Sequence, residues 1–209
     1  MNPIDKYILD HTAAEDPLLK ELFRDTHVKI MLPHMLSGHL QGKILGMITS
    51  MIKPQNVIEI GTYTGYSAIS IAHCLHENAK IISIDINDEL ESFTRGYIDK
   101  SGLNNKIDFL IGDALKIIPK MNIEFEMAFI DGDKSQYIDY FEIILPKMKK
   151  GGFIIADNVL WYGKVIQPLD PSDKFTKGIL EFNQYVHADP RVENVIFPIR
   201  DGLMVLRVL

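Results

Sequence analysis

Short apolar runs alternate with longer segments of helical periodicity from residue 56 onward. Strands are expected at residues 57–60, 80–86, 107–111, 125–130 and 153–156. Helices are expected at residues 67–75, 89–100, 114–118, 136–148 and 175–186. Continuous apolar strands that alternate with helices are typical of a parallel sheet with helices on both faces. The pattern therefore predicts an α/β protein with a doubly wound, mostly parallel sheet.

The two ends of the chain depart from this alternation. Near the C-terminus, two strand-like runs flank Asp201-Gly202, a dipeptide that favours a hairpin turn. The sheet is therefore predicted to finish with an antiparallel hairpin. Residues 1–50 are predicted to form a helical extension with breaks at Pro17 and Pro33, and residues 51–209 to form the sheet domain.

Composition narrows the class of protein. The 209 residues are 46% hydrophobic and 24% charged, as in a soluble globular protein. The net charge of −6 argues against nucleic acid or an anionic membrane as partner. No apolar run is long enough for a membrane span, and the N-terminus does not resemble a signal peptide, so a cytoplasmic location is expected. The basic run at 147–150 is interpreted as a helix C-terminus, and Cys74 as a buried thiol.

The run "VIEIGTYTGYS" predicts a strand, a glycine-rich turn and a helix start. Gly61 and Gly65 allow the backbone to approach a ligand closely, and the helix N-terminus favours an anionic group. The next strand ends in Asp85, whose carboxylate can accept hydrogen bonds from both hydroxyls of a ribose. A nicotinamide fingerprint would need glycine where Tyr63 and Tyr66 stand. The turn therefore favours a smaller anionic end such as a carboxylate, with a plain βα turn as the alternative.

The third strand ends in Asp113, within "IGDAL". Glu59, Asp85 and Asp113 are expected to face the crevice beyond the carboxyl ends of the strands. An acidic crevice suits a cofactor that carries positive charge. Asp113 is equally well interpreted as a helix N-cap.

Oxygen-bearing side chains also follow the fourth and fifth strands. Asp131 ends one apolar run and Asp157-Asn158 ends the other. If these strands are adjacent, their ends lie about 4.8 Å apart. Two carboxylates so close repel each other unless a charge neutralises them, and an all-oxygen set favours Mg²⁺, Mn²⁺ or Ca²⁺. The alternative is that each carboxylate caps a turn separately, which is expected for Asp133.

Lys134 and Trp161 are the candidate side chains for chemistry beside this oxygen set. Lys134 is a candidate general base, because desolvation and nearby positive charge favour the neutral amine. The alternative is a solvated lysine. Trp161 is either core filler or the wall of a pocket for a planar substrate.

The chain resembles the cation-dependent O-methyltransferases that use S-adenosylmethionine, the group containing caffeoyl-CoA and catechol O-methyltransferases. The resemblance extends from about residue 38 to the C-terminus. It rests on "VIEIGTYTGYSA", "IISIDIN", "IGDAL", "FIDGDKSQY", "GGFIIADNVLW" and "DGLMVLRVL", in that order. It implies a Rossmann-like seven-stranded sheet whose last strand is reversed, and a homodimer.

The resemblance also implies roles for individual residues. The metal ligands would be Asp131, Asp157 and Asn158, with Lys134 as the base and Trp161 beside the substrate. The residues that would bind S-adenosylmethionine are Gly42, Glu59, Gly61, Tyr63, Gly65, Ser67, Asp85, Asp113, Ala114 and Asp131. The expected acceptor is a small aromatic vicinal diol, free or CoA-linked.

Gly132 stands where plant enzymes of this group have alanine and catechol enzymes have histidine, which leaves the identity of the acceptor open.

Two other functions fit parts of the pattern. A nicotinamide-dependent oxidoreductase would share the sheet and Asp85 but not the metal oxygens. The alternative of a non-catalytic binding protein with the same fold is disfavoured by the presence of Lys134 beside those oxygens, because binding alone does not require a candidate base there.

Overall fold

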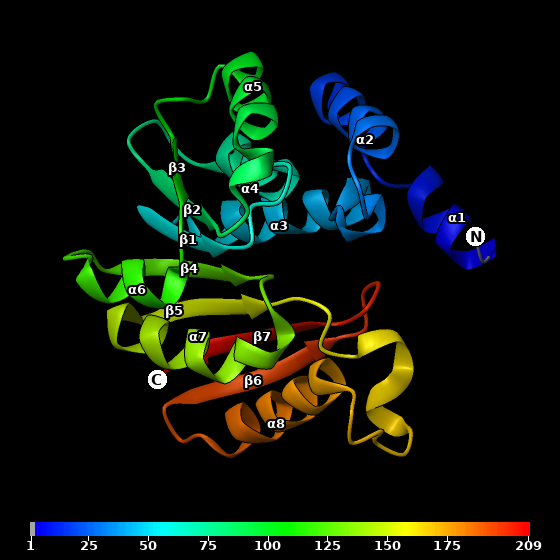
Figure 1. The fold of residues 1–209 in the computed structure, drawn as a ribbon. Coiled ribbons are helices and arrows are strands. Elements are labelled where there is room, and N and C mark those ends of the chain that lie inside the picture. The colour runs from blue at the N-terminus through cyan, green and yellow to red at the C-terminus, as the bar shows by residue number, and fades with distance from the viewer. Residues whose placement is uncertain (1–2) are drawn as a thin grey trace.

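A seven-stranded sheet with the order β3-β2-β1-β4-β5-β7-β6 forms the centre of the protein (Figure 1). The computed structural model describes residues 3–209. The strands are β1 (Asn56–Ile60), β2 (Lys80–Asp85), β3 (Ile107–Ile111), β4 (Phe125–Ile130), β5 (Met148–Ala156), β6 (Val192–Phe197) and β7 (Leu203–Val208). Strands β1 to β5 pair in parallel, and β7 pairs antiparallel with both β5 and β6. The predicted mostly parallel sheet with a C-terminal hairpin is confirmed.

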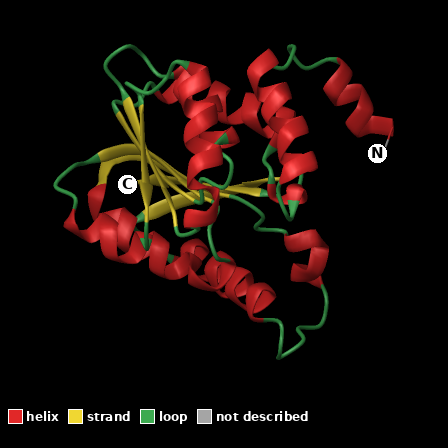
Figure 2. Cartoon of the chain, turned by 45° about the horizontal axis from the view of Figure 1, so that its top comes forward, coloured by secondary structure: helices red, strands yellow, loops and turns green. Residues whose placement is uncertain are grey.

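Helices cover both faces of this sheet (Figure 2). The α-helices are α1 (Pro3–Asp10), α2 (Pro17–Lys29), α3 (Gly38–Ile52), α4 (Tyr66–Cys74), α5 (Glu91–Ser101), α6 (Ala114–Ile117), α7 (Tyr137–Ile144) and α8 (Lys174–Ala188). Short 3-10 helices span Pro33–Met35, Asp88–Leu90, Ile118–Lys120, Lys134–Gln136, Leu145–Lys147 and Trp161–Ile166. None of the helices within residues 3–209 is long and apolar enough to cross a membrane.

The core is split by the sheet into two hydrophobic clusters. On one face, Met127 and Phe129 of β4 belong to the cluster with α2 to α5. On the other face, Ala128 and Ile130 of the same strand belong to the cluster with α6, α7 and α8. Because successive side chains of a strand point to opposite faces, a strand buried on both faces must be apolar throughout. This requirement explains why the strands were visible as continuous apolar runs.

The register of the central strands brings three strand ends to one edge. Ile60 pairs with Ile130, and Ile130 pairs with Ala156. The ladder continues for one more residue: the amide of Asp131 donates to the Ile60 carbonyl at 2.8 Å, and the amide of Asp157 donates to the Ile130 carbonyl at 3.0 Å. The two carboxylates therefore follow adjacent strands at equivalent positions.

Three local expectations meet a different structure. Lys147 of the basic run does end a helix, the 3-10 turn Leu145–Lys147, but the rest of the run belongs to β5, which begins at Met148, and Lys149 forms an ion pair with Glu126 of β4 at 2.5 Å. Cys74 is exposed, since it is the last residue of α4 rather than part of its buried face. The domain boundary expected after residue 50 falls inside α3, which packs against α4.

Candidate active site

Lys134 is held at the carboxyl edge of the sheet by two short hydrogen bonds. Its Nζ atom lies 2.7 Å from Oδ1 of Asp131 and 2.6 Å from the hydroxyl of Tyr137. Only 7% of the lysine is exposed, so it is not a solvated surface lysine. Burial raises the pKa of Tyr137 well above its usual value, which keeps the phenol protonated. That hydroxyl donates in turn to the backbone carbonyl of Asp157 at 3.0 Å.

The neighbouring Asp133 has a separate role. It is the N-cap of the 3-10 turn Lys134–Gln136, and its carboxylate accepts from the Ser135 amide at 2.8 Å. The Ser135 hydroxyl donates to the same oxygen at 2.6 Å. The expected capping role of Asp133 is therefore what the structure has.

Asp157 is almost completely buried, with 3% of its surface exposed. Its Oδ2 accepts from the side-chain amide of Gln41 at 2.6 Å, and its Oδ1 accepts from the backbone amide of Asn158 at 2.7 Å. Burial, and then the charge of Asp131, raise the pKa of Asp157 to about 6. The charge of Asp131 thus disfavours the ionised form of Asp157.

Asn158 continues this edge in an unusual backbone conformation. Its φ of 58° lies in the left-handed region, where a residue other than glycine persists only if its surroundings hold it. Asp201 lies beside it: burial raises the pKa of Asp201, while hydrogen bonding from the backbone of Tyr162 and from the Asn158 side chain opposes that rise. Oδ2 of Asp201 is buried and has no hydrogen-bond partner within the described residues.

The donor atoms of this edge suit a hard divalent cation. Asp131, Asp157 and Asn158 offer carboxylate and amide oxygens, the ligands that Mg²⁺, Mn²⁺ and Ca²⁺ prefer. Nowhere in residues 3–209 do three His, Cys, Asp or Glu side chains form a metal-binding group, so a cation here would depend on the amide as its third protein ligand. The Lys134 ammonium is the group that neutralises Asp131 in this structure.

A narrow pocket lies between the glycine-rich turn and the N-terminal helices. It is lined by Met35, Leu36, Ser37, Gly61, Thr62, Tyr63, Tyr66, Ser67 and Asp131. Gly61 has a φ of 96°, and a Cβ atom there would lie 2.2 Å from the Asp131 carbonyl oxygen. Only glycine permits this close approach of the turn to the end of β4. Four of the expected cofactor residues therefore line one pocket: Gly61, Tyr63, Ser67 and Asp131.

Glu59, the residue before the last of β1, lies fully buried next to Ser67 of this pocket. The hydroxyl of Ser83 donates to one of its carboxylate oxygens, and the other oxygen, Oε1, is buried without a hydrogen-bond partner within residues 3–209. Burial raises the pKa of Glu59 to about 7, although the hydroxyls of Ser67 and Ser83 oppose the rise. An unpartnered buried acceptor is costly, and a cofactor bearing an ammonium group would supply the missing donor. The site therefore fits the amino end of S-adenosylmethionine.

Asp85 is the hydrogen-bonded support of the glycine-rich turn. Its carboxylate accepts from the backbone amides of Tyr63 at 2.6 Å and Asn87 at 2.9 Å. Burial raises its pKa above the usual range. Each oxygen keeps a further lone pair, so the contact with the turn leaves acceptor capacity for a ribose.

The remaining expected cofactor residues do not line the pocket. Asp113 is the N-cap of α6, accepting from the Leu115 amide at 3.0 Å, and Ala114 is the buried first residue of that helix. Gly65 has a φ of 90° and forms the N-cap of α4. Gly42 faces α4, where a Cβ atom would lie 2.7 Å from Oγ of Ser70, so close helix packing explains its lack of a side chain.

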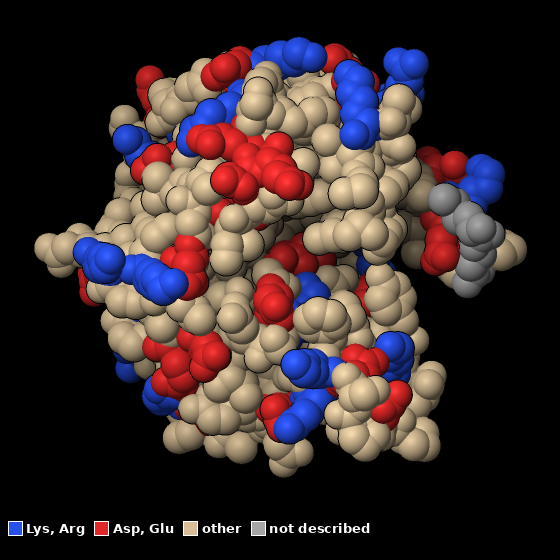
Figure 3. All heavy atoms as spheres, viewed as in Figure 1, with Lys and Arg blue, Asp and Glu red and all other residues tan. Residues whose placement is uncertain are grey.

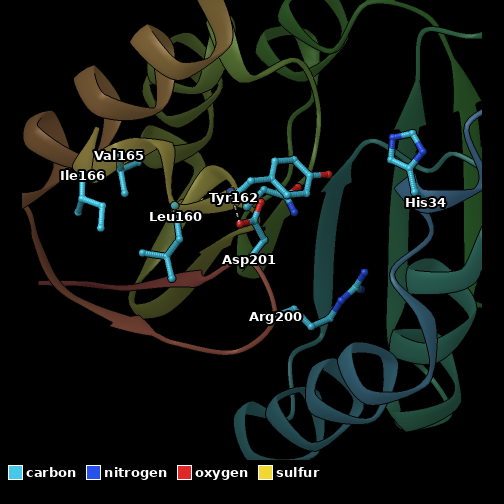
Figure 4. A pocket seen from close by; sticks show the side chains of 9 residues that line it. His34, Leu160, Tyr162, Val165, Ile166, Arg200 and Asp201 are labelled. Carbon is cyan, nitrogen blue, oxygen red and sulfur yellow. Dashed lines mark hydrogen bonds between the residues drawn. The ribbon is translucent and has the colours of Figure 1, made fainter. Parts of the chain in front are cut away.

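A second and larger cleft, of about 640 Å³, opens beyond the end of β5 (Figure 4). It is lined by His34, Asn158, Leu160, Tyr162, Gly163, Val165, Ile166, Arg200 and Asp201. Trp161 is not among these residues, because its ring packs edge-on against Phe175 at 6.2 Å, and Tyr162 faces the cleft instead. Figure 3 shows acidic side chains gathered around a hollow in one face of the molecule.

Sequence reasoning missed the roles of four side chains at this edge of the sheet. Tyr137 lies within the motif "FIDGDKSQY", and Gln41 directly precedes Gly42, but neither position carries a chemical signature of its own. Asp201 was interpreted as a turn residue. Arg200 donates to Oε1 of Gln41 at 2.6 Å, across 159 residues of chain, and no local pattern could have indicated it.

Comparison with known proteins identifies the family. A family model described as O-methyltransferase matches residues 9–209. Caffeoyl-CoA O-methyltransferase from Petroselinum crispum is 35% identical over 97% of this chain and 89% of its own. The enzyme of the same name from Mesembryanthemum crystallinum is 37% identical over 97% of this chain and 84% of its own.

Solved structures agree with this assignment. An O-methyltransferase from Bacillus cereus, determined in complex with SAH, superposes with a TM-score of 0.90 at 27% identity, over 99% of this chain and 97% of its own. A solved structure from Klebsiella pneumoniae superposes with a TM-score of 0.91 at 24% identity, over 98% of this chain and 96% of its own, and has the same fold. The chain therefore belongs to the O-methyltransferase family.

Proposed function

We propose that the protein transfers a methyl group from S-adenosylmethionine to one hydroxyl of an aromatic vicinal diol. The observation that carries the proposal is that the ends of two adjacent strands line two different hollows. Asp131, after β4, lines the narrow pocket at the glycine-rich turn and binds Lys134, and Asn158, after β5, lines the larger cleft. A methyl donor in the first and an acceptor in the second would meet beside the Lys134 amine.

Two carboxylates that contact residues of the narrow pocket suit the donor. The free Oε1 of Glu59 can accept from an ammonium group, and the carboxylate of Asp85 can accept from ribose hydroxyls. The related enzyme from Bacillus cereus was crystallised with SAH, the demethylated donor, which supports the same ligand here.

Asp131, Asp157 and Asn158 would hold a divalent cation at the junction of the two hollows. When bound, the cation supplies positive charge that favours the ionised form of an acceptor hydroxyl. The chain contributes the orientation of the ligands: Gln41 and the Asn158 amide fix both oxygens of Asp157.

The Lys134 ammonium would be replaced by a cation at Asp131 as the positive charge opposite that carboxylate. Lys134, then a neutral amine, would accept the acceptor's hydroxyl proton at Nζ. The hydroxyl oxygen then forms a bond to the methyl carbon while the bond from that carbon to the donor sulfur breaks. Tyr137 holds the amine in place. Because its phenol stays protonated, its hydroxyl accepts a hydrogen bond from Lys134 and donates one to the backbone carbonyl of Asp157. Positioning of the two reactants supplies much of the rate.

The acceptor is proposed from the cleft and the relatives together. Leu160, Tyr162 and Val165 offer apolar and aromatic surface for a flat ring next to Asn158. The relatives named for caffeoyl-CoA support an acceptor of catechol type, free or CoA-linked. A homodimer remains a prediction from the family resemblance.

The experiment is a transfer assay with methyl-labelled S-adenosylmethionine and pairs of acceptors. Each pair would contain a vicinal diol, free or CoA-linked, and the matching monophenol. We expect transfer to the diols, its loss with a chelator, and its recovery with Mg²⁺, Mn²⁺ or Ca²⁺. Equal transfer to monophenols, or transfer that ignores the chelator, would contradict the role of the cation. Binding of donor without transfer to any acceptor would favour a non-catalytic protein.

A further inference from the structure

Arg200 connects the C-terminal hairpin with the N-terminal part of the chain. It lies in the loop between β6 and β7 with a φ of 50°, in the left-handed region. Its guanidinium donates to the carbonyl oxygens of Ser37 and, at 3.3 Å, of Leu36, and to Oε1 of Gln41 at 2.6 Å. Figure 4 shows the side chain extending away from Asp201 toward the N-terminal helices. Three acceptors on one guanidinium hold this strained residue in place.

The contact with Gln41 determines which end of that amide faces Asp157. Gln41 is 1% exposed, and its Nε2 donates to Oδ2 of Asp157 at 2.6 Å. An amide has one accepting and one donating end. Because Arg200 can only donate, it holds the oxygen of Gln41 toward itself and leaves the NH₂ group for the carboxylate. Without Arg200, the amide could turn its oxygen toward Asp157, where two acceptors would face each other.

Arg200 also holds the wall of the donor pocket. Residues 31–37, which we call the strap segment, lie between the glycine-rich turn and the hairpin loop. At one end, the hydroxyl of Tyr63 donates to the carbonyls of Met31 at 2.9 Å and Leu32 at 3.2 Å. At the other end, Arg200 binds Leu36 and Ser37, which line the donor pocket.

We propose that Arg200 is a positioning residue that couples the donor pocket to the cation and acceptor site. In the donor branch of its contacts, Arg200 holds the strap segment, which forms the wall of the donor pocket. In the cation branch, Arg200 holds Gln41, which orients the carboxylate of Asp157. His34 of the strap segment and Arg200 itself also line the acceptor cleft, so a shift of the strap segment changes both hollows. The cation branch rests on the proposed function, whereas the donor branch needs only donor binding.

The test separates the two branches by mutation. The variants are Arg200→Ala, Arg200→Lys, Gln41→Ala and the double variant Arg200→Ala/Gln41→Ala. Arg207→Ala is the matched control, because Arg207 pairs with exposed Glu193 on the outer hairpin at 2.8 Å. Calorimetry with SAH measures the donor branch, and the rise of melting temperature with Mg²⁺ concentration measures the cation branch.

Gln41→Ala should weaken Mg²⁺ about 10–100-fold, as is typical when a group that orients a metal ligand is removed, and leave SAH affinity unchanged. Arg200→Ala should weaken both ligands, and the double variant should bind Mg²⁺ no worse than Gln41→Ala. Arg200→Lys should recover part of the loss. In the wild-type protein SAH should tighten Mg²⁺ by about fivefold or more, and this coupling should vanish in Arg200→Ala.

Each outcome either supports or refutes the coupling through Arg200. Unchanged affinities in Arg200→Ala, or additive losses in the double variant, overturn the coupling through Arg200. A wild-type protein that binds SAH but no Mg²⁺ overturns the proposed cation site and the cation branch with it. If Arg200→Ala does not fold, Arg200→Lys and Gln41→Ala still test the proposal. If both variants bind Mg²⁺ and SAH as tightly as the wild-type protein does, the proposal is refuted.

Discussion

Glu59→Gln should make the protein more stable above neutral pH while it weakens binding of the methyl donor. Glu59 is fully buried, and burial raises its pKa from the usual 4.5 to about 7. The Ser83 hydroxyl binds one carboxylate oxygen, and the other, Oε1, has no hydrogen-bond partner in the described part of the chain. Glutamine has nearly the same shape but carries no charge, so it removes the cost of a buried anion without leaving a cavity.

The magnitude follows from the shift in pKa. A carboxyl whose folded pKa is raised holds its proton more tightly in the folded state, so stability falls as pH rises from 4.5 to about 7. Each pKa unit is worth about 1.4 kcal/mol, so the loss amounts to about 3 kcal/mol. For a protein of this size that corresponds to roughly 6–12 °C in melting temperature.

The assay is urea unfolding of wild type and Glu59→Gln at pH 5 and pH 8, without donor or metal. Other groups also titrate in this range, and the difference between the two proteins isolates Glu59. We expect similar stability at pH 5 and a more stable variant at pH 8. Calorimetry with SAH should show weaker binding to the variant, because the acceptor proposed for the donor's amino group is lost. Parallel pH dependence of the two proteins would refute the reasoning.

The other predictions concern the carboxylates and the base. Asp131→Asn should be little stabilised by Mg²⁺ in melting curves, because it lacks a cation ligand, whereas the capping variant Asp133→Asn should respond like wild type; equal Mg²⁺ shifts in Asp131→Asn and wild type would remove Asp131 from the site. Lys134→Met should bind SAH normally but lose about 10²–10⁴-fold in methyl transfer, measured with a labelled donor, and wild-type turnover would leave Lys134 without a role as base. Asp85→Ala should weaken both S-adenosylmethionine and SAH by about 1.5–3 kcal/mol in calorimetry, the range for a charge-assisted hydrogen bond, and unchanged binding would show that Asp85 does not hold the ribose.

The sequence by itself determined the sheet and the edge at which its polar residues meet. β4 has the predicted bounds, Phe125–Ile130, because a strand buried on both faces must be apolar at every position and polar residues mark its end. The same rule placed Asp131 and Asp157 directly after strands, and the parallel pairing of β4 with β5 brought them together. The β5 start was missed because Lys149 and Lys150 interrupt the apolar run where the strand is exposed.

Only the tertiary structure decided which side chains orient these carboxylates. Gln41 reaches Asp157 across 116 residues of chain, and Arg200 reaches Gln41 across 159. Such contacts leave no periodicity, because each partner needs only the correct place in three dimensions and not a particular neighbour in sequence. The loop after β5 shows the same limit. Its left-handed residues turn Tyr162 into the cleft and Trp161 toward Phe175, and backbone conformation of that kind is imposed by the packed surroundings and not by local propensity.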